Sequence, residues 1–335
     1  MSGLPKIAMI PYGGTIASAV KPGVGATPSL DVGEMARQIP GVQEIAEVLP
    51  QPSKHLASSL MTVRDLLDIA AAARASVARG CRGVVVTQGT DTIEEIAFGL
   101  DLLCAGDDPI VVTGAMRNAS LPGADGPANV VAAIRVAASD AARGLGTLVV
   151  LNDEIHAARF VRKAHTANPS TFRSMATGPI GWLAERDVRI ALRPARRFAV
   201  GVPDDAIPAP VCLLKMSLGD DGRLLQYVPA AGFTGLVLEG FGGGHVPGDV
   251  AAPGLLESII ERMPVVLASR AGSGEVLRST YGGFPGSETD LVSRGVIYAG
   301  SLDGPKARIL LTLLLMRGAD RDEIIRTFAE IGPLS

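Results

Sequence analysis

Apolar residues recur with two different periods along the first part of the chain. Residues 6–10 form a short apolar run that ends in a glycine turn. Residues 62–80 then place apolar side chains at helical spacing, after Thr62 and Asp65 in a helix-start pattern and before a stop at Gly80. Residues 83–86 are the continuous, valine-rich run of a strand that is covered on both faces. The pattern predicts strand, helix, strand.

The same alternation continues to residue 151. Helices are expected at residues 92–104 and 127–139, and strands at 110–112 and 147–151. This predicts an α/β fold with a doubly wound, mainly parallel sheet. Ligands bind such sheets outside the carboxyl ends of the strands, where the strand order reverses. We therefore expect that edge to hold Thr15, Thr90, Asp91 and Ala115, which all follow predicted strands.

A proline-rich stretch without hydrophobic period, residues 194–210, is the predicted linker between two domains. A chain of 335 residues also exceeds the length of about 250 to 300 at which a single core stops growing. We predict a larger N-terminal α/β domain at residues 1–193 and a smaller C-terminal α/β domain at 211–335. In the smaller domain, strands are expected at 211–216, 235–238, 264–268 and 296–299, and helices at 255–262, 306–316 and 320–331.

Composition and charge exclude several classes of partner. A formal net charge of −3 without a basic run predicts no nucleic-acid binding. The longest apolar run, residues 309–316, is far shorter than the roughly 20 residues of a membrane span, so no membrane partner is expected. The start of the chain lacks the apolar core of a signal peptide, and the three cysteines are widely spaced, which together predict a cytoplasmic protein. Four scattered histidines offer no metal motif, so no metal is expected.

Two turns that carry hydroxyl groups follow predicted strands. In Tyr12-Gly13-Gly14-Thr15, two glycines let the backbone turn tightly and present the Thr15 hydroxyl. In Gln88-Gly89-Thr90-Asp91, a hydroxyl stands beside a carboxylate. Each turn alone also fits a side chain that caps the next helix. Together, they can face one substrate carbonyl, so that one hydroxyl attacks while the other places a water or relays a proton.

These two motifs, residues 12–17 and 88–95, resemble the signature motifs of bacterial-type L-asparaginases. The resemblance extends over nearly the whole chain, through residues 112–117, 124–129, 149–153, 171–174 and 306–311. It implies an amidohydrolase without a cofactor, which converts L-asparagine to L-aspartate and ammonia through a threonine acyl-enzyme. It also implies a homotetramer, a dimer of dimers, with active sites near the subunit interface.

The resemblance also assigns the site residues. Thr15 matches the nucleophile, and Thr90 and Asp91 match the second hydroxyl and its acid–base support. Lys163 matches the active-site lysine of the family, whereas by itself it would be read as a solvated surface lysine. Oxyanion stabilisation requires N–H donors, which we expect from Thr90 and Ala115. The substrate-binding residues implied are Ser58, which would hold the α-carboxylate, with Ser59, Gly89 and Ala115.

Some positions depart from the family pattern. Members often carry Gln or Ser followed by Asp where this chain has Ser59 and Leu60, which leaves L-glutamine or a different amide open as the substrate. Residues 18–30 lack the tyrosine of a lid, although glycines at 23 and 25 leave a lid open. Tyr281 and Glu288 are candidates for completing a partner's site, but an ordinary exposed loop is the simpler expectation there.

Two functions from other classes are the alternatives. The run Gly240-Phe241-Gly242-Gly243-Gly244 suggests an NAD-dependent oxidoreductase, but His245 stands where the dinucleotide-binding fingerprint needs a third glycine. A small-molecule binding protein that has lost its chemistry is the other alternative. The intact pair of Thr15 and Thr90 argues against it.

Overall fold

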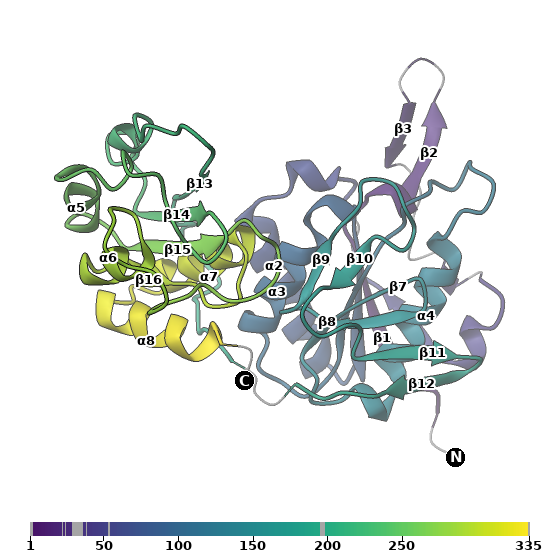
Figure 1. Cartoon of the computed structure of the whole chain (residues 1–335). Helices are drawn as coiled ribbons and strands as arrows, with labels where there is room; N and C mark the ends of the chain where they lie inside the picture. Colours follow the sequence, from purple (N-terminus) through teal and green to yellow (C-terminus); the bar gives the residue numbers. More distant parts are fainter. Residues whose placement is uncertain are drawn as a thin grey trace. The chain divides into compact units, whose positions relative to one another are not determined.

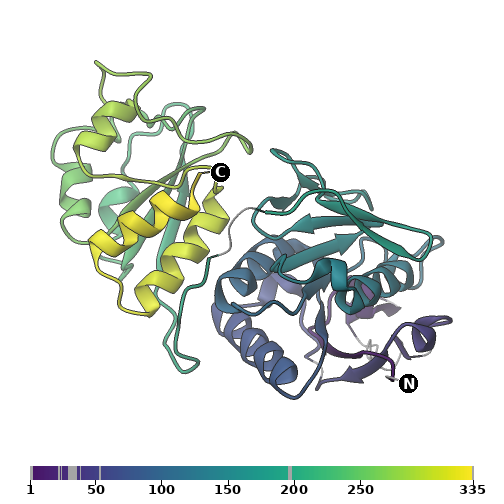
Figure 2. The same ribbon diagram turned by 90° about the horizontal axis from the view of Figure 1, so that it is seen from below.

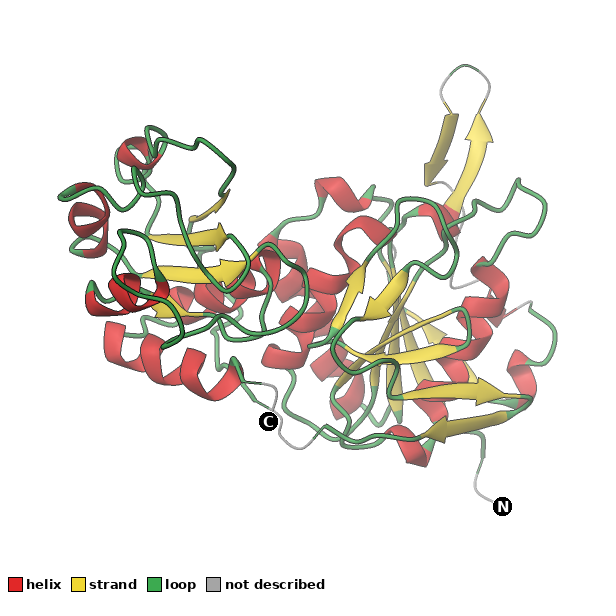
Figure 3. Ribbon diagram, in the orientation of Figure 1, coloured by secondary structure: helices red, strands yellow, loops and turns green. Residues whose placement is uncertain are grey.

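The computed structural model describes residues 3–21, 23, 25–28, 36–37, 39–52, 54–194 and 198–333. The chain divides into two compact units, Met1–Ala199 and Val200–Ser335. Each unit combines a sheet with helices, which confirms the predicted α/β class (Figures 1 and 3). Positions 195–197 of the predicted linker lie outside the described residues. None of the helices in the described part of the chain has the length and apolar character needed to cross a bilayer.

The N-terminal unit is built on an eight-stranded sheet with the order β12-β11-β8-β7-β6-β5-β1-β4. Five neighbouring strands, from β4 to β7, are parallel, and the other three run antiparallel at one edge. The prediction of a mainly parallel sheet is therefore confirmed. The strands are β1 Lys6–Pro11, β4 Glu47–Pro50, β5 Gly83–Thr87, β6 Ile110–Thr113, β7 Thr147–Leu151, β8 Glu154–Ala157, β11 Gly181–Ala184 and β12 Asp187–Ile190.

Helices cover both faces of this sheet. Helices α2 (Val63–Ala78) and α3 (Ile93–Leu103) contact each other and pack on one face, while α4 (Gly126–Ala138) packs on the other (Figure 1). Strands β5 and β6 are buried along their whole length because they are covered from both sides. Burial of these apolar side chains is the main stabilising contribution to the unit.

The start of α2 follows the predicted capping pattern. The Thr62 hydroxyl oxygen accepts the Asp65 N–H at 3.4 Å, and the Asp65 carboxylate accepts the Thr62 N–H at 2.9 Å. Each residue thus satisfies a backbone donor that the helix itself leaves unpaired. The N-terminal end of α2 is thereby fixed.

The strand order reverses between β1 and β5. After β1 the chain forms β4 on one side of β1, and then returns to form β5 on its other side. The register pairs Pro11 with Thr87, so both strands end at the same level of the sheet. A crevice outside these two carboxyl ends is the expected ligand position in this class of fold. The turns that carry Thr15 and Thr90 start there.

The antiparallel edge of the sheet was not predicted. After β7 the chain reverses at Asn152 and Asp153, which have φ values of 53° and 60°. Two consecutive residues with positive φ form the tight turn that suits a β-hairpin, and asparagine and aspartate tolerate this conformation better than most residues. Two small hairpins lie outside the main sheet: β9 Val161–Lys163 with β10 Phe172–Ser174, and β2 Ser18–Lys21 with β3 Gly25–Pro28. The expected lid segment includes positions 22, 24, 29 and 30, which lie outside the described residues.

The C-terminal unit is a four-stranded parallel sheet with the order β13-β14-β15-β16. Helix α7 packs along β13, β14 and β15, and α8 contacts β16 (Figure 2). The glycine run after β14 leads into a β-bridge between Phe241 and His245, and the next helix begins only at Leu255, so no dinucleotide-binding turn forms. The elements are β13 Val211–Lys215, β14 Gly235–Gly240, α5 Leu255–Ile260, β15 Val265–Ser269, α6 Glu288–Ser293, β16 Ile297–Tyr298, α7 Gly304–Met316 and α8 Arg321–Ile331.

Replacing Thr62 by alanine tests the start of α2. Loss of the capping hydroxyl leaves the Asp65 N–H without this partner, and we expect the free energy of unfolding to fall by about 1 kcal/mol. Urea denaturation followed by circular dichroism measures the change. Thr166→Ala, in an exposed loop, is the matched control and should leave the transition unchanged. Equal midpoints for Thr62→Ala and the control would contradict the capping role.

Candidate active site

The two hydroxyl-bearing turns meet through their glycines. The Tyr12 N–H donates to the Thr87 carbonyl at 2.7 Å, which keeps the chain after β1 beside the end of β5. A Cβ atom at Gly14 would lie 2.1 Å from the Gly89 nitrogen, and Gly14 has a φ of 81°. Only glycine fits a position with this conformation and so little space. The backbone contact lies one residue before Thr15 in one turn and one residue before Thr90 in the other.

A third loop closes on both turns. The Gly14 N–H donates to the Leu56 carbonyl at 3.1 Å. A Cβ atom at Gly89 would lie 2.5 Å from the Ser58 Oγ, so the serine hydroxyl occupies the space that the missing side chain leaves. Ser58 is buried, and its hydroxyl accepts the Asp91 N–H and donates to the Asp91 Oδ2, both at 3.3 Å. Ser58 is thereby fixed next to the second turn.

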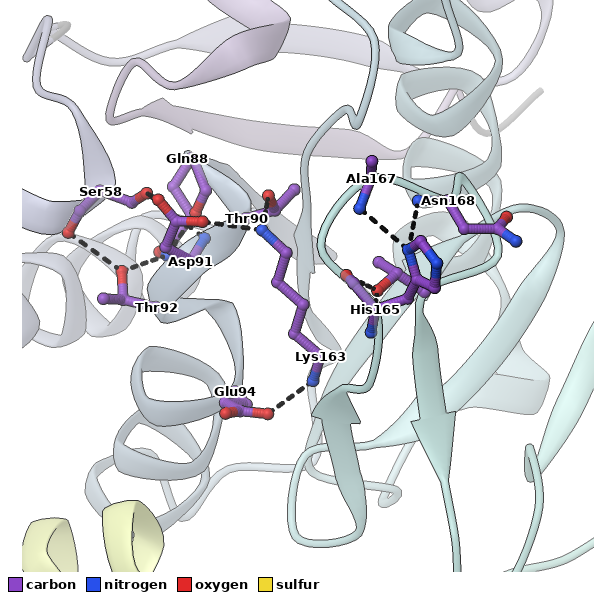
Figure 4. A network of polar contacts seen from close by, with 12 residues as sticks. Ser58, Gln88, Thr90, Asp91, Thr92, Glu94, Lys163, His165, Ala167 and Asn168 are labelled. Carbon is purple, nitrogen blue, oxygen red and sulfur yellow. Dashed lines mark hydrogen bonds and ion pairs between the residues drawn. The ribbon is translucent and has the colours of Figure 1, made fainter.

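Lys163 connects the second turn to the β9–β10 hairpin. Its ammonium group donates to the Thr90 Oγ1 at 2.9 Å and to the Asp91 Oδ1 at 2.7 Å (Figure 4). Thr90 is 5% exposed, so its hydroxyl has a fixed partner in a mostly buried position. The side chain of Lys163 is 16% exposed, which rules out the simple reading of a solvated surface lysine. The structure therefore brings Thr90, Asp91 and Lys163 together as the resemblance implied.

The ion pair lowers the pKa of Asp91. The hydrogen bond from Lys163 is the main cause that holds the pKa of the Asp91 carboxyl below its ordinary value. The Asp91 side chain is 64% exposed, so solvent screens the pair and its contribution to stability is at most about 1 kcal/mol. Its main effect is to hold the ammonium group, and through it the Thr90 hydroxyl, in one place.

Thr15 begins the short 3₁₀ helix Thr15–Ala17, directly after Gly14. The Ser18 hydroxyl donates to the Gly14 carbonyl at 2.8 Å, and the Ala17 N–H donates to the same oxygen at 3.0 Å. Ile16 and Ala17 are buried, whereas Thr15 is partly exposed. The turn is rigid on its inner side and leaves Thr15 accessible, as a nucleophile requires.

The loop after β6 lies against the second turn. A Cβ atom at Gly114 would lie 3.3 Å from the Thr90 Cγ2, and Ala115 is fully buried. Asn129 donates to the Gly114 carbonyl at 2.9 Å, and the Met116 N–H donates to Asp125 at 3.0 Å. The main chain of this loop is therefore the part that can face a ligand. Asn129 and Asp125 hold this loop, and they lie in the motif of residues 124–129, which by itself assigns them no role in the site.

The remaining predicted residues lie in different surroundings. Ser59 and Leu60 follow Ser58 in the 3₁₀ helix Ser58–Leu60 and are both exposed, Leu60 by 67%. An ordinary exposed loop was expected around Tyr281 and Glu288. This expectation is wrong for Glu288, which is buried. Tyr281 is 50% exposed, but Glu288 is fully buried, where its carboxylate accepts the Tyr281 N–H at 2.7 Å. A carboxylate that satisfies buried backbone donors belongs to the framework of the C-terminal unit.

Glu94 is a contact that sequence reasoning did not foresee. In the first turn of α3 it reads as a side chain that complements the helix dipole. In the structure its carboxylate accepts the backbone N–H of Lys163 at 2.6 Å. The contact spans 69 positions of the chain, so no local pattern could reveal it.

A metal site requires several ligating side chains that lie close together. Throughout the described ranges, no three histidine, cysteine or carboxylate side chains gather into a group that could hold a metal ion. What the site does offer is two threonine hydroxyls, a carboxylate and an ammonium group. This set can transfer protons and can supply an oxygen nucleophile.

Comparison with known proteins identifies the family of both units. The family model for the N-terminal domain of asparaginases matches residues 6–196, and the model for the glutaminase/asparaginase C-terminal domain matches residues 210–328. An L-asparaginase of Bacillus licheniformis is 34% identical over 319 residues, covering 92% of this chain and 95% of that protein. A probable L-asparaginase of Deinococcus radiodurans is 36% identical over 341 residues and covers 98% of both chains.

A similar structure has also been solved. The crystal structure of a probable cytoplasmic L-asparaginase from Campylobacter jejuni superposes with a TM-score of 0.87 at 29% sequence identity. The match covers 97% of this chain and 99% of that one. The similarity thus extends over both units of the fold.

Replacing Lys163 by methionine tests the ion pair. We expect the pKa of Asp91 to rise toward the ordinary value of about 3.9, because the hydrogen bond that lowers it is lost. A lowered folded-state pKa stabilises the fold above the unfolded value, and this stabilisation is lost as the pH falls through the folded pKa. Any stability advantage of the wild type should therefore begin to decline below about pH 4, the unfolded-state pKa, and be lost once the pH has fallen below the lower folded-state pKa of Asp91. NMR titration of the aspartate carboxyl carbons measures the pKa directly.

Lys215→Met is the matched control, because Lys215 pairs with Glu239 in the C-terminal unit. In this variant the pKa of Asp91 should stay at the wild-type value. An Asp91 titration that is identical in Lys163→Met and wild type would contradict the assigned cause.

Proposed function

The chain belongs to the L-asparaginase family of amidohydrolases, and on that premise we propose that it hydrolyses the side-chain amide of L-asparagine to L-aspartate and ammonia. The observation that carries the proposal is the meeting of the two turns at Gly14 and Gly89, with the Thr90 hydroxyl held by Lys163. Membership of this family replaces the alternative of an NAD-dependent oxidoreductase.

Thr15 is the proposed nucleophile. Its Oγ attacks the amide carbon, and the new C–O bond gives a tetrahedral intermediate. The C–N bond then breaks, ammonia leaves with the proton that came from the threonine hydroxyl, and an ester remains on Thr15. A water molecule attacks the ester, which releases L-aspartate and restores the hydroxyl. Partial exposure of Thr15 beside a buried, rigid backbone supports this role.

Thr90, Asp91 and Lys163 are the proposed acid–base group. A hydroxyl group has one proton to donate and two lone pairs to accept with. The ammonium of Lys163 uses one lone pair of Thr90, so the Thr90 proton stays available for a water molecule or the leaving group. Asp91 holds the ammonium group through its Oδ1 and the Ser58 hydroxyl through its Oδ2.

Substrate binding is assigned to the surrounding loops. Ser58 would hold the α-carboxylate, with Ser59, Gly89 and Ala115 lining the pocket. The N–H groups of Thr90 and Ala115 are the proposed donors to the developing oxyanion. Support comes from the contact of the loop after β6 with Thr90.

A different amide is the second candidate, and one observation favours it. Ser59 has a short side chain, and Leu60 is 67% exposed beside Ser58, so an apolar group replaces polar contacts at this rim. L-glutamine and amides without an α-amino group belong in the substrate panel. Ammonia release from each amide ranks them, and a crystal soaked with L-aspartate would show which groups meet the α-amino end.

Assembly and location extend the proposal. From the family resemblance we propose a homotetramer, a dimer of dimers. From the similarity to a probable cytoplasmic L-asparaginase we propose a cytoplasmic location. Sedimentation equilibrium would distinguish tetramer, dimer and monomer.

Replacing either threonine tests the proposed chemistry. We expect Thr15→Ala and Thr90→Val each to lower kcat for L-asparagine by at least about 1000-fold, because each residue belongs to one catalytic unit whose losses do not add. Ammonia release measures the rate. Mass spectrometry of the acid-quenched reaction should find the ester on the peptide that contains Thr15 in the wild type and not in Thr15→Ala.

Thr234→Val, which removes an exposed hydroxyl in the C-terminal unit, is the control and should keep the wild-type rate. Circular dichroism confirms that each variant is folded. Wild-type turnover in either Thr15→Ala or Thr90→Val would refute the assignment.

A further inference from the structure

One short segment, residues 90–94, bonds to Lys163 at two places, its side-chain ammonium group and its backbone N–H. The ammonium group bonds to Thr90 and Asp91, and the backbone N–H of the same residue bonds to Glu94 (Figure 4). All three partners belong to the turn after β5 and the first turn of α3. The lysine side chain is therefore stretched between two anchors that come from one rigid segment.

The backbone anchor has a structural reason. Strand β9 belongs to a ribbon of only two strands, β9 and β10. In a two-stranded ribbon, each strand has backbone groups that point away from its partner and need another acceptor or donor. The Lys163 N–H finds the Glu94 carboxylate at 2.6 Å, a short, charge-assisted hydrogen bond. Helix α3 therefore takes the place of a third strand at this position.

The position of this anchor determines where the ammonium group can reach. The side chain of lysine is flexible, and ordering it costs up to about 2 kcal/mol of rotamer entropy. Its ammonium must meet Thr90 at 2.9 Å and Asp91 at 2.7 Å together. Protein N–H···O hydrogen bonds span about 2.7–3.2 Å, so with the side-chain torsions unchanged a shift of the backbone by about 1 Å would take at least one of these two contacts out of that range.

A carboxylate at Glu94 is more than this N–H requires, since water or a neutral oxygen would satisfy it. The neighbouring Glu95 occupies the same first turn of α3 and supplies negative charge to the helix start as well. What distinguishes Glu94 is its hydrogen bond to the backbone of Lys163 in β9. Its side chain spans the distance between α3 and β9 and brings an acceptor to the Lys163 N–H.

We propose that Glu94 is a positioning residue, which sets the reach of Lys163 and so keeps the ammonium on the Thr90 hydroxyl. The proposal rests on the proposed amidase chemistry, in which Lys163 supports Thr90. Glu94 touches neither the substrate nor the reacting atoms. It should affect the rate of the chemical step and leave substrate binding nearly unchanged.

Three substitutions at one position separate reach from charge. Glu94→Gln keeps the length and an oxygen acceptor, and kcat should stay within about threefold of wild type. Glu94→Asp keeps the charge but is one methylene shorter, and Glu94→Ala removes the acceptor. For both we expect kcat to fall by about 100-fold, the usual effect of a catalytic group displaced by about 1 Å, with KM within about twofold. Glu95→Ala is the matched control and should keep the wild-type kcat.

A second measurement does not need turnover. Lys163 is 16% exposed and ion-paired, so it should react slowly with acetic anhydride in the wild type. Acetylation rates, read by mass spectrometry of the peptide that contains Lys163, should rise by at least about tenfold in Glu94→Ala and Glu94→Asp and remain low in Glu94→Gln. The rate at Lys215 in the same samples is the internal reference.

The outcomes distinguish the two proposals. A wild type that hydrolyses no amide refutes the proposed function, while increased Lys163 labelling in Glu94→Ala and Glu94→Asp would still support the positioning role. Active enzyme with unchanged kcat and labelling in Glu94→Asp would overturn the role of Glu94. A loss of kcat in Glu94→Gln equal to that in Glu94→Ala would also overturn it, because charge and not reach would then be the cause. If Glu94→Ala fails to fold, the comparison of Glu94→Asp with Glu94→Gln decides.

Discussion

The contact of one backbone with another, Gly14 against Gly89, is the constraint on which the whole site depends. A Cβ atom at Gly14 would lie 2.1 Å from the Gly89 nitrogen, so the backbones of the two turns leave no room for a side chain between them. Everything else follows from the order of the sheet, which places the ends of β1 and β5 side by side. Two threonines from distant parts of the sequence are thereby held by main-chain packing and not by flexible side chains.

The charged pair of Lys163 and Asp91 orients side chains and contributes little to stability. The pair of Lys163 and Asp91 is too exposed to add much stability, but it fixes the ammonium group on a buried hydroxyl. Ser58 is bonded to the same aspartate and so joins the loop before α2 to this pair. The apolar sheet fixes the backbone, and the few charged groups fix the orientation of the Thr90 and Ser58 hydroxyls. This division explains how a site with so little buried charge can still be well ordered.

Much of the fold was predictable, because the parallel strands carry continuous apolar runs and Thr62 with Asp65 marks the start of α2. The antiparallel edge was not, because its strands are short, because β11 and β12 are half exposed, and because the reversal depends on Asn152 and Asp153 adopting positive φ. The motifs indicated which residues form the candidate site. Contacts between distant segments, such as Glu94 with Lys163, lie beyond any local pattern. The burial of Glu288 was misjudged for the same reason, since its partners depend on how the loop folds back.

The exposed side chain of Leu60 has a consequence for how such a site can diverge. It stands two residues from the buried Ser58, yet 67% of it faces solvent. Exchanges at such a position cost little folding free energy, in contrast to those at the tightly packed glycines. Selection can therefore sample new side chains beside Ser58 while the backbone contact of Gly14 with Gly89 remains unchanged. A surface built in this way can change its chemistry by single substitutions, without first acquiring a more stable scaffold.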